Sequence, residues 1–90
     1  MNETIYEAKE PALSVSELIV EISKCLCDNL PDIKIEEKTG EKSTVININV
    51  ARSDIGKIIG KQGSIISSIR TICENISAKN QKRVSVHIID

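Results

Sequence analysis

The stretch IIGKQGSII, residues 58–66, interrupts an apolar run with two glycines and two polar residues. Gly60 and Gly63 close one apolar segment and open the next, because isoleucine resumes directly after the loop. Glycines at such positions are typical of a corner between two helices. Lys61 and Gln62 have no evident role in a purely structural corner. Their presence favours a loop that also contacts a ligand.

Helical patterns flank this loop on both sides. Ser53 or Asp54 can cap a short helix that ends near Ile59. After the loop, one apolar stripe predicts a longer helix that closes within 78–81, with stripe positions at 65, 66, 69, 72, 73 and 76. The loop is therefore expected to join a short helix to a long one.

Further elements are predicted before and after this pair of helices. Ser14 and Glu17 form a capping box that opens a helix, whose apolar positions continue to Leu30 until Pro31 ends it. Alternating apolar and polar residues predict strands at 33–36, 45–50 and 84–88, with a turn at 38–41. The order is helix, strand, strand, helix, helix, strand. It predicts one α+β domain with a three-stranded sheet and helices on one face.

Length and composition limit the classes of protein. Ninety residues with 40% apolar side chains suit one small aliphatic domain. Residues 1–12 lack periodicity and are expected to be a flexible extension, which leaves 13–90 as the domain. Tyr6 is the single aromatic residue, so base stacking on aromatic rings is nearly excluded. No apolar run is long enough to span a membrane.

The cysteines and the histidine do not indicate a metal or catalytic site. Three cysteines, at 25, 27 and 73, are an odd number without zinc-finger spacing, which favours thiols in a reducing cytoplasm. His87 alternates with apolar residues and is expected on a sheet surface rather than as a catalytic base. No cofactor, metal ligand set or enzymatic constellation is expected.

Charge is divided unevenly along the chain. Residues 1–45 carry 5 basic and 10 acidic side chains, whereas residues 46–90 carry 7 basic and 3 acidic ones. The half that contains the glycine loop is therefore the basic half. This asymmetry favours one face that attracts anions, although a solvated mixture of charges would give the same count.

Four kinds of glycine loop could in principle account for these residues. A nucleotide-binding P-loop needs four residues between its glycines, but only three separate Gly56 from Gly60, and Gln62 replaces the Mg²⁺-binding hydroxyl. The dinucleotide fingerprint fails because position 58 is isoleucine. A structural corner remains possible. A G-x-x-G loop that clamps single-stranded RNA explains the lysine and glutamine as well.

Residues 58–66 resemble the KH core pattern V-I-G-x-x-G-x-x-I. The element order resembles the type II KH arrangement, and the chain is similar to the bacterial single-KH KhpA family. This resemblance implies a mixed three-stranded sheet with three helices on one face. It also implies single-stranded RNA binding in the cytoplasm, as an RNA chaperone or post-transcriptional regulator. The implied partners are a second copy in a homodimer and a larger KH protein of the KhpB (Jag or EloR) type.

The expected RNA-binding residues follow from the loop and its flanks. They are Lys57, Ile58, Ile59, Gly60, Lys61, Gln62, Gly63, Ser64 and Arg70. Lys57 and Arg70 could instead be solvated, and the isoleucines could instead belong to the core. The alternative function is a KH-fold module that acts through protein contacts with incidental RNA binding. Four apolar residues expected outside the core could form an association patch through which the protein pairs with itself or with a second RNA-binding protein: Val20, Cys27, Val45 and Ile89.

Overall fold

The computed structural model describes residues 3–8 and 14–89. Residues 3–8 contain neither helix nor strand. The predicted boundary between residues 12 and 13 lies outside the described residues.

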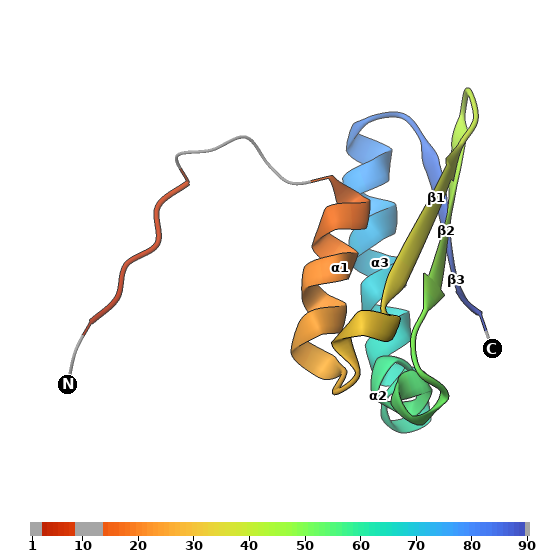
Figure 1. The fold of residues 1–90 in the computed structure, drawn as a ribbon. Coiled ribbons are helices and arrows are strands. Elements are labelled where there is room, and N and C mark those ends of the chain that lie inside the picture. The colour runs from red at the N-terminus through yellow and green to blue at the C-terminus, as the bar shows by residue number, and fades with distance from the viewer. Residues whose placement is uncertain (1–2, 9–13, 90) are drawn as a thin grey trace.

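The described residues form three α-helices and three strands in the predicted order (Figure 1). Their bounds are α1 (Val15–Leu26), β1 (Lys34–Thr39), β2 (Ser43–Asn49), α2 (Ile55–Ile59), α3 (Ser64–Lys79) and β3 (Arg83–Ile89). β2 is the central strand, antiparallel to β1 and parallel to β3. α1 and α3 cover one face of this mixed sheet, and α2 lies at one end of the layer. The predicted α+β fold is confirmed.

The core lies between the sheet and the two long helices. Ile46 and Ile48 of β2 are fully buried, and Val86 of β3 pairs with Ile46 in register. The intervening strand residues face the open side, because side chains alternate along a strand. From the helices, Ile19 and Ile69 fill the space opposite. The two-residue period thus places an aliphatic layer under both helices.

α1 begins as predicted but ends earlier. The Ser14 hydroxyl accepts from the Glu17 N–H at 3.1 Å, and Glu17 accepts in return from the Ser14 N–H at 3.3 Å. The helix stops at Leu26 rather than near Leu30, and Pro31 lies in a separate 3₁₀ turn. The prediction was wrong because Cys27, the C-cap residue, has extended backbone angles of φ −94° and ψ 151°.

The burial of one cysteine also differs from expectation. Cys27 was expected outside the apolar stripe, but it is buried, while Cys25 is exposed. In α3, Ile72 was expected on the stripe but is 48% exposed. The buried stripe instead passes through Cys73 and Ser77. All three cysteines are free thiols, and burial raises the pKa of Cys27 and Cys73.

The hairpin and the proposed association patch also differ from expectation. Lys38 and Thr39 were expected in a turn, but both continue β1 by pairing with β2.

The residues expected in the association patch do not lie together. Cys27 cannot belong to such a patch because it is buried. Val45 and Ile89 lie on the open sheet face, while Val20 belongs to α1 on the other side. The four residues do not form one patch.

Candidate nucleic-acid interface

α2 has five residues and ends at Ile59, with Gly60 as its C-cap residue. Gly60 has φ 76° and ψ 174°, a conformation that is essentially restricted to glycine. A Cβ atom at this position would lie 2.5–2.9 Å from atoms of Ile65, including its backbone nitrogen. Gly60 therefore allows the end of α2 to pack directly against the start of α3. Its requirement for glycine comes from the fold itself.

Gly63 has a different role in the loop. Gln62 and Gly63 are both left-handed, with φ values of 56° and 77°. The Gly63 N–H donates to the Gly60 carbonyl at 3.1 Å, and the Ser64 N–H donates to the Lys61 carbonyl. A Cβ atom at Gly63 would meet nothing within 4 Å. The loop is one tight turn, and its Gly63 side is open to an approaching molecule.

The turn leaves two backbone donors at its tip. The N–H groups of Gly63 and Ser64, which lead into α3, are used within the turn. The N–H groups of Lys61 and Gln62 have no hydrogen-bond partner within the part of the chain that the structure describes. Both side chains are exposed. Successive free N–H groups in such a turn form an anion-binding concavity.

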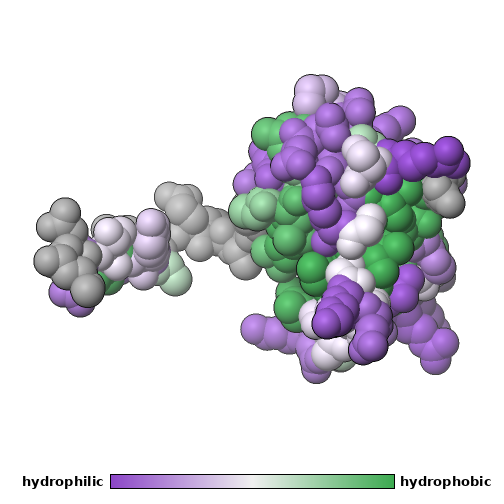
Figure 2. Space-filling view, turned by 90° about the horizontal axis from the view of Figure 1, so that it is seen from below, coloured by the Kyte–Doolittle hydropathy of each residue, from purple (hydrophilic) through white to green (hydrophobic). Residues whose placement is uncertain are grey.

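The isoleucines around the loop divide between core and surface. Ile58 is fully buried, so the prediction that it contacts RNA is wrong: it has no exposed surface and instead fixes α2 to the core. Ile59 is 36% exposed. Figure 2 views the end of the molecule where α2 lies and shows hydrophobic surface on both sides of a band of hydrophilic and near-neutral side chains. This end therefore offers both polar and apolar contacts.

Arg70 lies beside the free edge of β3. Its Nε donates to the Val86 carbonyl at 3.0 Å, which leaves the terminal NH₂ groups of the guanidinium available. A hollow of about 220 Å³ opens here, lined by Arg70, Glu74 and residues 84–87. Arg70 lies six residues after Ser64, about 9 Å along the helix axis at 1.5 Å per residue. The hollow is thus a short distance from the loop.

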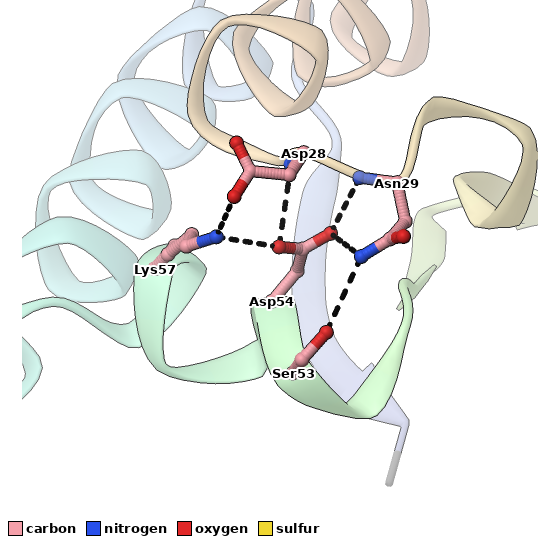
Figure 3. Close-up of polar contacts among 5 residues, drawn as sticks. All are labelled: Asp28, Asn29, Ser53, Asp54 and Lys57. Atoms are coloured by element: carbon pink, nitrogen blue, oxygen red, sulfur yellow. Dashed lines mark hydrogen bonds and ion pairs between the residues drawn. The ribbon is translucent and has the colours of Figure 1, made fainter.

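Lys57 takes part in a polar network that the sequence analysis missed (Figure 3). Asp54 was expected to cap α2, but its carboxylate instead accepts from the N–H groups of Asp28 (3.2 Å) and Asn29 (3.0 Å). Lys57 donates to Asp54 at 2.9 Å and to Asp28 at 2.5 Å. The network ties the start of α2 to the chain that follows α1. The spacing of three residues between Asp54 and Lys57 was a signal for this ion pair.

The network shifts the pKa of both central groups. The hydrogen bond from the Asn29 N–H, followed by that from Lys57, holds the pKa of Asp54 well below its ordinary value. Contacts with Asp28 and then Asp54 raise the pKa of Lys57. Both groups are therefore charged throughout the neutral range. The expected contact of Lys57 with phosphate stays a prediction.

Replacement of Asp54 by asparagine should change how stability depends on pH. The unfolded chain has a carboxyl pKa of about 3.9 at this position, above that of the folded state. As pH falls, the unfolded chain therefore takes up the proton first, and the stabilisation by Asp54 is lost progressively below about pH 5. At pH 7 we expect Asp54→Asn to melt about 10 °C lower than the wild type. Between pH 5 and 2, the free energy of unfolding of the variant should fall less steeply than that of the wild type.

Thermal melting at pH 7 measures the first effect, and urea denaturation at several pH values measures the second. Asp32→Asn is the control, since Asp32 is exposed and belongs to the 3₁₀ turn that follows. Parallel pH profiles for the wild type and Asp54→Asn would show that the network does not stabilise the fold.

The helix–loop–helix around two glycines with positive φ, joined to a mixed three-stranded sheet, defines a type II KH domain. Residues 16–88 match the family described as "KhpA/KhpB, KH domain", and the chain belongs to this family. The chain is 41% identical over 75 residues to "RNA-binding protein KhpA" of Clostridium acetobutylicum, covering 83% of this chain and 100% of that protein. It is 43% identical over 74 residues to the protein of that name in Borreliella burgdorferi, covering 82% and 90%.

Within residues 3–8 and 14–89, no group of three or more His, Cys, Asp or Glu side chains could hold a metal ion. No helix among these same residues is long and apolar enough to cross a membrane. His87 is exposed on β3, as expected for a sheet-surface residue.

Proposed function

We propose that this protein binds single-stranded RNA and clamps its backbone with the loop Gly60–Gly63. The observation that carries the proposal is the tip of the loop, where two N–H groups without a partner in the described part of the chain lie beside an exposed lysine and glutamine. Relatives that share about two fifths of its residues are named RNA-binding proteins, which supports the same function.

The strand can follow the surface from the loop towards β3. One phosphate binds at the N–H groups of Lys61 and Gln62, with the lysine ammonium adding a charge-assisted hydrogen bond. Gly63 and Ser64 let the backbone come close, and Ile59 supplies apolar surface for a base. Arg70, with its terminal NH₂ groups available, lies further along. We expect a footprint of roughly four nucleotides, as a KH loop holds.

The biological role we propose is that of an RNA chaperone or post-transcriptional regulator in the cytoplasm, with residues 13–90 as the binding domain. A short footprint without an aromatic platform binds weakly, so pairing raises the avidity. A second copy and a KhpB-like KH protein are the partners we propose. No step in this function requires a cofactor or catalysis.

The alternative is a module that acts chiefly through protein contacts. Ile72 and Ile89 favour it, because each is an isoleucine with more than two fifths of its surface exposed, at 48% and 42%. Under this alternative, RNA would bind without dependence on the loop residues. Isolated exposed apolar residues are common in monomers, so RNA binding remains the better-supported function.

Salt dependence and the form of the nucleic acid test the proposal. Of the three basic residues expected at the site, Lys57 is paired with acids among the described residues. Lys61 and Arg70 remain, which gives about two phosphate contacts. At roughly 0.7 counterions per phosphate, the log–log salt slope for single-stranded RNA should be about −1.5. Fluorescence anisotropy with a labelled single strand and the matching blunt duplex measures both. Tighter binding to the duplex would contradict a groove that needs unpaired bases.

A further inference from the structure

Lys57 is held by two carboxylates that differ sharply in their surroundings. The side chain of Asp54 is fully buried, whereas that of Asp28 is 81% exposed. Asp54 also accepts from two backbone N–H groups and from the side-chain amide of Asn29 (Figure 3). Asp28 has one side-chain partner within the described part of the chain, the Lys57 ammonium. Asp54 is therefore a fixed part of the fold, and Asp28 is a replaceable one.

The charges of the network also distinguish Asp54, which is fixed, from Asp28, which is replaceable. Two carboxylates surround one ammonium, so the cluster carries one excess negative charge. Asp54 alone neutralises Lys57, and the extra anion is Asp28. A lysine ammonium has three N–H donors, and here two of them are used. Lys57 is 40% exposed, so a further anion can reach it from solvent.

We propose that Lys57 is a second phosphate subsite, and that a backbone phosphate of bound RNA replaces the Asp28 carboxylate there. The inference rests on the proposed function. Lys57 lies three residues before Gly60, about 4.5 Å along the axis of α2, so a phosphate next to the one at the loop can reach it. In the free protein Asp28 occupies the position of that phosphate.

The exchange is chemically balanced. Carboxylate and phosphate oxygens both accept charge-assisted hydrogen bonds from an ammonium, so one can substitute for the other. Asp28 loses little when it is released, because its exposed carboxylate returns to water and exposed ion pairs contribute little. Asp54 remains bound to Lys57 throughout and keeps α2 in place. Asp28 therefore lowers RNA affinity without being needed for the fold.

The test compares Asp28→Asn with the wild type by fluorescence anisotropy, using a fluorescein-labelled single-stranded octauridylate. Removing the competing carboxylate should raise affinity at least three-fold at low salt. The log–log salt slope should be about −2 for both proteins, because a phosphate at Lys57 adds about 0.7 to the slope expected from Lys61 and Arg70 alone. Asp32→Asn is the matched control, because Asp32 is also an exposed aspartate and has no side-chain contact with Lys57. It should change affinity much less.

The effect of Asp28→Asn should also disappear in a Lys57→Met background, where no ammonium remains to be released. As a measurement that does not require that variant to fold, RNA should shift the ¹³C carboxyl resonance of Asp28 and not that of Asp32. Equal gains from Asp28→Asn and Asp32→Asn, or an Asp28 resonance that RNA leaves unmoved, would overturn this inference alone. If neither the wild type nor Asp28→Asn bound the probe, the proposed function would fail together with it.

Discussion

Replacing Lys61 and Gln62 together by aspartate is expected to abolish RNA binding while leaving the fold intact. The change puts two carboxylates where the phosphate would lie and removes one ammonium. Loss of a charge-assisted hydrogen bond and the added repulsion should lower affinity by about 100-fold or more, since each 1.4 kcal/mol is tenfold. The fold should tolerate the change because both side chains are exposed, and aspartate accepts the left-handed conformation of Gln62.

The chain provides a matched control for this variant. Lys79 is the last residue of α3, and Gln81 lies in the turn that follows it. Both are exposed, and Gln81 is also left-handed, with φ 58°. Lys79→Asp with Gln81→Asp makes the same chemical change at a distant turn. Anisotropy should show a much smaller loss for this control, and circular dichroism should show folded protein in both cases. Equal losses would mean that overall charge, and not the loop, governs binding.

Alanine at Gly60 is expected to destabilise the protein far more than alanine at Gly63. At Gly60 the added methyl group would overlap Ile65, including its backbone nitrogen, in a conformation that only glycine adopts readily. We expect a loss of about 3 kcal/mol or more in the free energy of unfolding. At Gly63 the space is open, and only the left-handed conformation is strained, at about 1 kcal/mol.

Urea denaturation of the two variants measures this difference. Gly63→Asn should be closer to the wild type than Gly63→Ala, because asparagine visits the left-handed region more readily. Similar losses for Gly60→Ala and Gly63→Ala would show that the contact between Gly60 and Ile65 does not define the loop.

The order of elements and the loop could be predicted because their signals are local. The capping box at Ser14, the alternation in β2 and the glycines of the loop each act within a few residues. Their outcome does not depend on distant parts of the chain. The same holds for the position of Lys61 at the loop tip, which follows from its place between two glycines.

Features that depend on distant contacts could not be predicted. Asp54 has the residue type and position of a helix cap, but its carboxylate binds the backbone of residues 28 and 29. That contact joins segments about 25 residues apart and accompanies the early end of α1. Ile58 and Ile59 are adjacent and chemically identical. Only the packing of a five-residue helix decides that Ile58 is buried and that Ile59 reaches the surface.

The most direct test of RNA binding through the loop is an NMR titration of the ¹⁵N-labelled protein with a single-stranded octauridylate. We predict that the largest amide shifts occur at Lys61 and Gln62, whose N–H groups have no partner among the described residues, and then at Gly63 and Ser64. Smaller shifts should follow near Arg70. Shifts confined to the open sheet face around Val45 and His87, with an unchanged loop, would contradict the proposal.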